Sequence, residues 1–161
     1  SDVKMKFDGS DFVTTVPAGS AFLIGTNGGT PNDNNGNADF VFGSRYMSNA
    51  SSDDDTLITY VGNKIFSLLG NLFFSLKISD ILYTYVMGNT KFAHSLDLKE
   101  KKFSLCIELP IKAKRSGFNL ISYPCHEKER IAGKKKVNAF KDGFLILLSM
   151  IKLFFNKPKR K

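Results

Sequence analysis

Residues 57–76 read LITYVGNKIFSLLGNLFFSL and carry a continuous helical pattern. Apolar side chains recur there at intervals of three and four positions, which places them on one broad face of an α-helix. Gly62 and Gly70 weaken such a helix slightly, or allow another element to pack closely against it. The stretch therefore predicts a helix that closes within residues 77–80. The apolar positions are 57, 58, 61, 65, 68, 69, 72, 73 and 76.

The elements on either side of this helix indicate the class of fold. Asp39–Phe42 predicts a short buried strand, and Cys106–Ser116 predicts a second helix with Pro110 near its first turn. Phe118–Tyr123 alternates in polarity and predicts another strand. Phe140–Phe155 predicts a final amphipathic helix, and the whole order favours an α/β sheet with flanking helices. One side of the last helix carries Phe140, Phe144, Leu147, Leu148, Ile151 and Phe155.

The first 37 residues differ in composition from the rest of the chain. Phe12–Val16 and Ala21–Thr26 are short β-prone runs four residues apart, which predicts a hairpin. Gly25–Asn37 contains four Gly and five Asn, which is typical of a linker. We therefore predict a diverged or unrelated segment with an Asn/Gly linker over residues 1–37. Residues 38–156 form one domain and residues 157–161 a basic tail.

The net charge of +8 is concentrated near the C-terminus. Residues 128–161 contain eleven Lys or Arg and two Asp or Glu, so this segment carries the whole positive excess. A concentrated basic segment attracts phosphate in nucleotides, anionic lipid headgroups or nucleic acids. A solvated tail is the alternative, and for residues 156–161 it is the preferred interpretation.

The composition also excludes several classes of protein. A hydrophobic content of 42% excludes a disordered chain. Cys106 and Cys125 are too few for a disulfide framework or a structural zinc site, and we expect free thiols in a reducing compartment. No run of about 18 apolar residues occurs, so the sequence predicts no membrane-spanning helix. Phe144–Phe155 is the most apolar stretch, and Lys152 interrupts it.

Four stretches beyond residue 37 resemble a known family when they are read in order. They are ADFVFGSRY (38–46), YVGNKIFSLLGNLFFSLKISD (60–80), FSLCIELPIKAKRSGFNLISYP (103–124) and ERIAGKKKVNAFKDGF (129–144). Their order and spacing resemble family 2 glycosyltransferases related to dolichol-phosphate mannosyltransferase and bacterial undecaprenyl-phosphate sugar transferases. Members of that family show a GSR turn, a GN…LSN helix, a TD or SD pair, a PEL-type helix, a GY strand and an R..G.SK motif before a KDGF-type helix. The resemblance covers about 120 of the 161 residues.

The resemblance implies an incomplete GT-A-like, Rossmann-like sheet with flanking helices, preceded by a short β-hairpin and linker. It implies inverting transfer of a sugar from a nucleotide sugar to a polyprenyl phosphate or a related acceptor. It further implies a Mg²⁺ or Mn²⁺ ion held by an acidic DxD-type motif. The expected location is cytoplasmic, peripheral at the cytoplasmic face of a membrane.

The resemblance also implies roles for five residues. Asp80 would position or deprotonate the acceptor, and Glu108 would be a second catalytic carboxylate. Arg45, Arg130 and Lys136 would bind phosphate groups of the substrates. Structural alternatives exist for three of them. Arg45 would form a salt bridge or a turn hydrogen bond, Asp80 would cap the next turn, and Glu108 would pair with a cation, preferably Arg130.

The donor-binding half of the family would precede residue 38. Residues 1–37 are too few for it, so we expect no pocket for the nucleotide and few ligands for the metal. We therefore expect that the chain is either a fragment or dependent on a partner chain. Asp8 and Asp11 are the candidates for metal ligands, although ordinary turn residues are the preferred interpretation. The alternative function is a non-catalytic membrane-surface or assembly module that uses the basic C-terminal segment. Nucleic-acid binding is disfavoured, because Lys128–Lys141 lacks interleaved aromatic residues.

Overall fold

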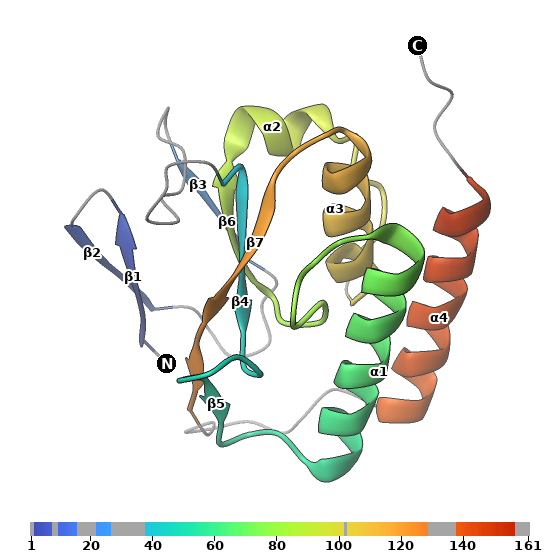
Figure 1. Cartoon of the computed structure of the whole chain (residues 1–161), viewed down its shortest axis with the longest axis horizontal. Helices are drawn as coiled ribbons and strands as arrows, with labels where there is room; N and C mark the ends of the chain where they lie inside the picture. The colour runs from blue at the N-terminus through green and yellow to red at the C-terminus, as the bar shows by residue number, and fades with distance from the viewer. Residues whose placement is uncertain are drawn as a thin grey trace.

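The computed structural model describes residues 38–101, 103–128 and 138–156, with only the backbone at positions 89 and 90. Before residue 38 it describes only the backbone of strands β1 (Asp2–Phe7), β2 (Ser10–Thr15) and β3 (Phe22–Thr26). Within these ranges the chain forms a small mixed sheet and four helices (Figure 1). The α/β class predicted from the sequence is therefore confirmed.

The strands and helices predicted between residues 38 and 156 are all present. Three strands and one short helix were not predicted, namely β5, β6, β8 and α2. In chain order the elements are β4 (Phe40–Ser44), β5 (Ser51–Ser52), α1 (Leu57–Phe74), β6 (Tyr85–Asn89), α2 (Thr90–Ser95), α3 (Phe103–Arg115), β7 (Leu120–Pro124), β8 (His126–Glu127) and α4 (Ala139–Phe155).

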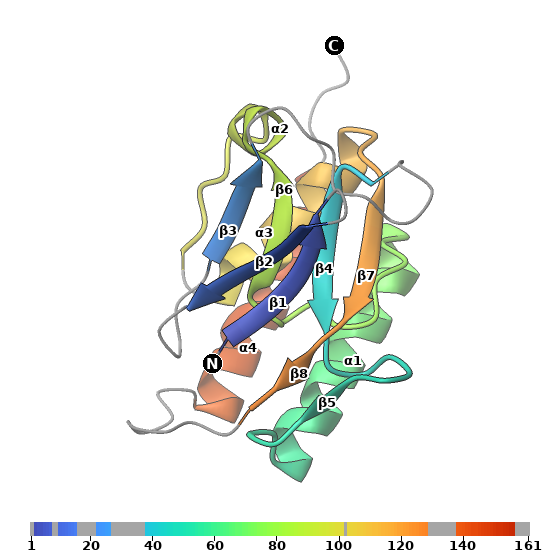
Figure 2. The same cartoon turned by 90° about the vertical axis from the view of Figure 1, so that its left-hand side faces the viewer.

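Four strands form the central sheet in the order β3-β6-β4-β7 (Figure 2). β3 runs parallel to β6, β6 antiparallel to β4, and β4 parallel to β7. Phe40 of β4 lies opposite Gly88 of β6 and beside Leu120 of β7. β5 and β8 form a separate parallel pair. β5 follows β4 after six residues and β8 follows β7 after one, so the pair lies beyond the carboxyl ends of β4 and β7 in the chain.

The predicted hairpin between Phe12–Val16 and Ala21–Thr26 is wrong in its pairing. Both runs form strands, but β2 pairs antiparallel with β1, whereas β3 joins the central sheet beside β6. The sequence held a signal for the true partner. Residues 2–7 alternate strictly in polarity, and an Asp-Gly pair separates them from β2, which is a strong hairpin signal.

The hydrophobic core lies between the sheet and a layer of three helices. α1, α3 and α4 cover one face of the sheet, and the β1–β2 hairpin lies on the opposite side (Figure 1). The Phe40 ring meets the Phe118 ring edge-on with centroids 5.7 Å apart, and Phe118 stacks on Phe92 at 4.7 Å. The large apolar side chains that are fully buried are Phe40, Phe42, Leu76, Ile78, Ile81, Ile107 and Ile111.

Capping side chains determine where the two long helices begin. The Thr56 hydroxyl accepts the backbone N–H of Thr59 at 3.3 Å, and the backbone N–H of Thr56 donates to the Thr59 hydroxyl at 2.9 Å. This reciprocal arrangement is a capping box at the start of α1. The Asn138 side chain accepts the N–H of Lys141 at 3.0 Å and starts α4.

α3 begins three residues earlier than predicted, at Phe103 instead of Cys106. Pro110 therefore lies inside the helix and not near its first turn, so that expectation is wrong. A proline in this place cannot donate a hydrogen bond to the carbonyl of Cys106. Pro110 and its neighbours Ile107 and Ile111 are fully or almost fully buried, so packing offsets the lost bond.

Candidate functional site

A buried ion pair joins the end of β4 to the segment that follows α1. Arg45 directly follows β4, and its Nε lies 2.7 Å from Oδ2 of Asp80. Its Nη2 donates to Oδ1 of the same carboxylate at 3.1 Å, which makes the contact bidentate. The backbone N–H of Arg45 adds a third bond to Oδ2 at 3.3 Å. The structure therefore brings together two predicted site residues that are 35 positions apart.

A second carboxylate meets the same guanidinium group from β8. Nη1 of Arg45 donates to Oε2 of Glu127 at 3.2 Å, and the Ser52 hydroxyl donates to the same oxygen at 2.6 Å. Asp55 Oδ1 lies 3.8 Å from Nη1. We call Arg45, Asp55, Asp80 and Glu127 the Arg45 cluster. It sits beyond the carboxyl ends of the parallel neighbours β4 and β7, where ligand sites of α/β proteins concentrate.

Two tyrosine rings enclose the guanidinium group of Arg45. Its Cζ lies 4.8 Å from the Tyr83 ring centroid and 5.1 Å from that of Tyr46. Burial alone would lower the pKa of Arg45, but the hydrogen bond and charge of Asp80 outweigh burial and leave its pKa raised. Burial, together with the hydrogen bond to Asp55, raises the pKa of Tyr46. At neutral pH Arg45 is therefore charged, and the two tyrosines beside it are neutral.

The geometry defines what the Arg45 cluster can do chemically. One guanidinium group faces three carboxylates, so the cluster is not a ready site for an anion. A phosphate group can bind Arg45 only by taking the place of a carboxylate, because both ligands use the same planar fork of N–H donors. Displacement of Asp80 from Arg45 would take the three hydrogen bonds of Arg45 away from a carboxylate that is fully buried.

Glu108 lies in a different network, on α3. Its Oε1 is 2.7 Å from Nζ of Lys112, and its Oε2 accepts the backbone N–H groups of Lys99 at 2.8 Å and Glu100 at 2.7 Å. Burial would raise the pKa of Glu108, but the bonds from Lys112, Glu100 and Lys99 outweigh burial and lower it. In the described part of the chain the cation that pairs with Glu108 is thus Lys112, whereas the preferred partner, Arg130, lies outside the described residues. The hydrogen bonds that Glu108 accepts from residues 99 and 100 hold the segment before α3 in place.

The other candidates lie outside the side chains that the structure describes. Arg130, Lys136 and Asp8 belong to undescribed residues, and Asp11 is described only as backbone within β2. The predicted phosphate-binding roles of Arg130 and Lys136 therefore remain predictions.

The described residues offer no site for the implied Mg²⁺ or Mn²⁺ ion. Among them no group of three or more His, Cys, Asp or Glu side chains is arranged to hold a metal. His126 pairs with Asp53 at 3.2 Å and hydrogen-bonds the hydroxyl of Ser51. The three carboxylates of the Arg45 cluster surround a cation of the protein itself. The side chains that the structure describes thus do not fit the metal.

Both cysteines carry free thiols, as predicted. Burial raises the pKa of Cys106 to about 12 and that of Cys125 to about 11. A thiol must lose its proton to act as a nucleophile. Neither cysteine is therefore a candidate for nucleophilic catalysis near neutral pH.

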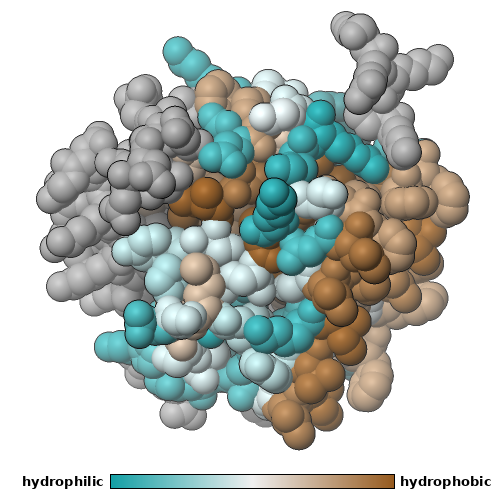
Figure 3. Space-filling model, in the orientation of Figure 1, coloured by the Kyte–Doolittle hydropathy of each residue, from teal (hydrophilic) through white to brown (hydrophobic). Residues whose placement is uncertain are grey.

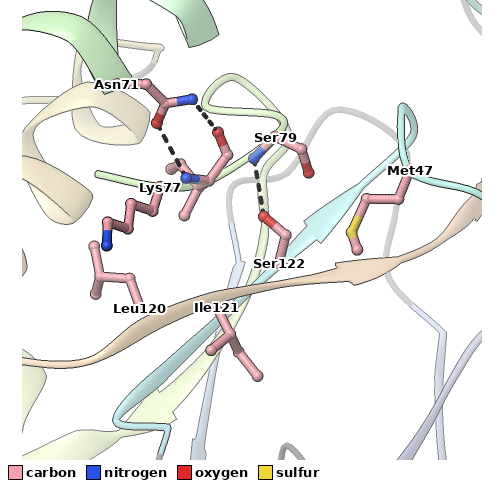
Figure 4. A pocket seen from close by; sticks show the side chains of 8 residues that line it. Met47, Asn71, Lys77, Ser79, Leu120, Ile121 and Ser122 are labelled. Atoms are coloured by element: carbon pink, nitrogen blue, oxygen red, sulfur yellow. Dashed lines mark hydrogen bonds between the residues drawn. The ribbon is translucent and has the colours of Figure 1, made fainter. Parts of the chain in front are cut away.

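A shallow hollow of about 550 Å³ is lined in part by Met47 and Ser79, which are close in sequence to Arg45 and Asp80 (Figure 4). It was not anticipated from the sequence, because its lining comes from four separate stretches of the chain. Ser79 donates its backbone N–H to the Ser122 hydroxyl at 2.9 Å, and the Asn71 side chain binds both backbone groups of Ile78. The lining residues are Met47, Asn71, Lys77, Ile78, Ser79, Leu120, Ile121 and Ser122.

The apolar stripes of α1 and α4 face outward. The sequence predicted one apolar face on each helix, yet α1 buries only Ser67 and Gly70, and α4 only Ile146, Ser149, Met150 and Leu153. We call the exposed apolar surface of the two helices the α1/α4 face. Its large side chains are Leu57, Ile58, Tyr60, Val61, Ile65, Leu68, Leu72, Phe73, Phe140, Phe144, Leu145, Leu147, Leu148, Ile151, Phe154 and Phe155.

α1 is the one described helix that is long and apolar enough to cross a membrane by length and composition. Its 18 residues have a mean hydropathy of 1.2, and 17% of them are buried. Comparison of the chain with family models, with curated proteins and with solved structures found no match in any of the three.

Proposed function

We propose that this domain carries the acceptor side of a family 2 glycosyltransferase. The reaction transfers a sugar from a nucleotide sugar to a polyprenyl phosphate or a related acceptor, at the cytoplasmic face of a membrane. The observation that supports this proposal is the meeting of Arg45, Asp80 and Glu127 beyond the carboxyl ends of two parallel strands. Two of these three residues are the ones that the resemblance singles out.

In this proposal the acceptor phosphate exchanges with Asp80 on Arg45. Phosphate and carboxylate both match the guanidinium fork, so the phosphate can occupy the bonds that Asp80 now makes at 2.7 and 3.1 Å. The released Asp80 carboxylate then positions the acceptor, or takes its proton where the acceptor carries one. Arg130 and Lys136 stabilise the departing nucleotide diphosphate. Glu108 accepts the N–H groups of residues 99 and 100 in a separate network, and its catalytic role stays a prediction from the resemblance.

The test is donor binding followed by transfer. The full chain is titrated with UDP- and GDP-sugars in the presence of Mn²⁺ by calorimetry, and then given detergent-dispersed polyprenyl phosphate. Asp80→Asn should keep the heat of donor binding and lose transfer at least about a hundredfold, in the range of a lost acid–base group. Lys101→Gln, at an exposed position, serves as the matched control and should leave both unchanged. Absence of heat with every donor would exclude sugar transfer by this chain.

A second candidate is a non-catalytic module at a membrane surface or in an assembly with a partner chain. The observation that favours it is that Arg45 and Asp80 already satisfy each other, as a purely structural ion pair does. Under this alternative, Asp80→Asn changes stability only, and vesicle binding persists in a chain that binds no donor.

A further inference from the structure

The α1/α4 face is one continuous surface. α1 and α4 pack against each other, and both pack against α3. The rings of Phe73 and Phe154 bridge the two helices with centroids 5.8 Å apart. Figure 3 shows the hydrophobic residues gathered in a band on the side of the molecule where α1 and α4 lie. Sixteen of the seventeen large exposed hydrophobic residues of the described chain belong to it; Tyr123 is the other.

The exposure of this face requires an occupant. Leu57 is 79% exposed and Phe140 is 82% exposed. Soluble monomers rarely expose contiguous apolar patches larger than a few hundred Å². A surface of this extent marks contact with a lipid phase or with another protein.

Charge distinguishes between these occupants. α1 contains one charged residue, Lys64, and α4 contains Lys141, Asp142 and Lys152. The Asp142 carboxylate accepts the N–H of Asn138 at the start of α4, so it is engaged in capping. In the sequence, three lysines at 134–136 precede α4, and four basic residues among 157–161 follow it. An apolar helix with basic residues at both ends matches an anionic lipid interface.

The same charges disfavour a second copy as the occupant. If two copies met through this face, both would carry the same basic residues next to α4 in the sequence. Their like charges would oppose the contact, whereas anionic headgroups neutralise them.

α1 is fastened to the domain along its inner side, which favours lying in the interface over crossing it. The Ser67 hydroxyl accepts the backbone N–H of Ile81 at 3.0 Å. The Asn71 side chain donates to the carbonyl of Ile78 at 2.8 Å and accepts its N–H at 3.1 Å. A spanning α1 would lose these bonds. Its 18 residues give a length of about 27 Å, short of a hydrocarbon core of about 30 Å.

We propose that the α1/α4 face docks on an anionic phospholipid bilayer, with both helices lying in the plane of the interface. This inference rests on the membrane setting of the proposed function and is independent of sugar transfer. The docked face adjoins the Arg45 cluster. Tyr46, next to Arg45, packs edge-on against Tyr60 of α1 with centroids 5.2 Å apart, and Nζ of Lys64 lies 4.8 Å from the Tyr46 ring.

The experiment uses the full chain with vesicles of phosphatidylcholine, alone or with about 30% phosphatidylglycerol, a charge content that creates a surface potential. The chain should float with the anionic vesicles and bind neutral ones more weakly. The double variant Leu68→Gln/Leu72→Gln removes two exposed leucines, and its affinity for anionic vesicles should fall at least about tenfold. Tyr123→Gln is the matched control, because Tyr123 is exposed outside the face and should not affect binding. Equal circular dichroism and melting temperature establish that the variants fold.

Depth is measured with a single tryptophan, because the chain contains none. Phe144→Trp should show a blue-shifted emission and quenching by brominated lipids, whereas Tyr123→Trp should show neither. The proposal is overturned if anionic vesicles do not bind, if neutral vesicles bind equally well, or if the leucine variant binds as the parent does. If the chain binds vesicles but no sugar donor, sugar transfer by this chain is excluded and the docking proposal holds. If it binds a donor but no vesicles, the docking proposal is wrong and sugar transfer is still supported.

Discussion

Arg45 connects three segments of the chain through one guanidinium group. It follows β4, and its partners Asp80 and Glu127 come from the segment after α1 and from β8. The side chain of Asp80 is wholly buried and that of Arg45 is 9% exposed. Removal of one member of such a buried ion pair is costly, because the other charge then stays buried without a partner to offset its lost hydration.

Removal of the arginine should therefore destabilise the domain strongly. Arg45→Met leaves Asp80 buried without a cation, and we expect the free energy of unfolding to fall by about 3–5 kcal/mol. The double variant Arg45→Met/Asp80→Asn should recover part of that loss, because no uncompensated carboxylate remains at position 80. Urea unfolding followed by circular dichroism measures both. A loss below about 1 kcal/mol for Arg45→Met, the range of exposed pairs, would show that the pair is not buried in solution.

Glu108 should give the domain a distinct dependence on pH. Its folded pKa lies below the ordinary value of 4.5, so its contribution to stability is complete above that value. The contribution is lost as pH falls through the folded pKa. Glu108→Gln should lower the free energy of unfolding by about 1–3 kcal/mol near neutral pH, since charged hydrogen bonds to Lys112 and two N–H groups are lost.

The difference between the parent and Glu108→Gln should shrink in chemical denaturation below about pH 4.5. Glu100→Gln is the matched control. The partner of Glu100, Lys152, is well exposed, so that substitution should change stability little. A difference that stays constant down to acidic pH would contradict the assignment.

The long helices show what the sequence can and cannot predict at the scale of elements. Periodicity alone located α1 and α4 within one or two residues at most ends, and it predicted which residues share a face. It did not reveal that this face points outward. Ser67 and Gly70, which are small, let the other side of α1 approach Ile81 and Leu76 closely. The apolar face of a helix ordinarily packs against the core, and the sequence pattern does not show when tertiary contacts leave it exposed instead.

The pairing of β4 with β6 should depend on the absence of a side chain at Gly88. A Cβ at Gly88 would overlap the ring of Phe40, with Cε1 at 2.6 Å, and that ring is fully buried and confined by Phe118. Gly88→Ala should cost about 1–3 kcal/mol by overpacking. Gly62→Ala, on the exposed side of α1 with no atom within 4 Å, should instead stabilise by up to about 1 kcal/mol. Thermal unfolding measures both effects: the melting temperature should fall for Gly88→Ala and rise for Gly62→Ala.

The whole molecule is two-sided, with the helical layer on one side of the sheet and the β1–β2 hairpin on the other (Figure 1). The order of strands and helices in the sequence was enough to predict the class of this fold. The contacts between distant segments could not be predicted in this way. The partnership of Arg45 with Asp80 joins positions 35 apart, and that with Glu127 joins positions 82 apart, so no local pattern contains either. The candidate site was thus predicted as a set of residues, whereas its closed, mutually satisfied arrangement required the structure.

At this scale the exposed α1/α4 face predicts the behaviour of the protein without lipid. In aqueous buffer the chain should associate as its concentration rises, since contact between apolar faces removes them from water. A mild non-ionic detergent should return it to a monomer in sedimentation velocity. Leu68→Gln/Leu72→Gln should associate less. A single dimer that persists in detergent would instead identify a second copy as the occupant of the face.

The parallel pairing of β4 with β7 has a consequence for the order of events during synthesis. Phe40 pairs beside Leu120, so the sheet cannot close until most of the domain has been translated. α1 ends at Phe74 and is complete well before β7 begins. At about 5–20 residues per second, that interval is on the order of seconds. In the docking arrangement proposed above, the nascent α1 meets the bilayer first, and the sheet then assembles on a helix that already lies at the lipid surface.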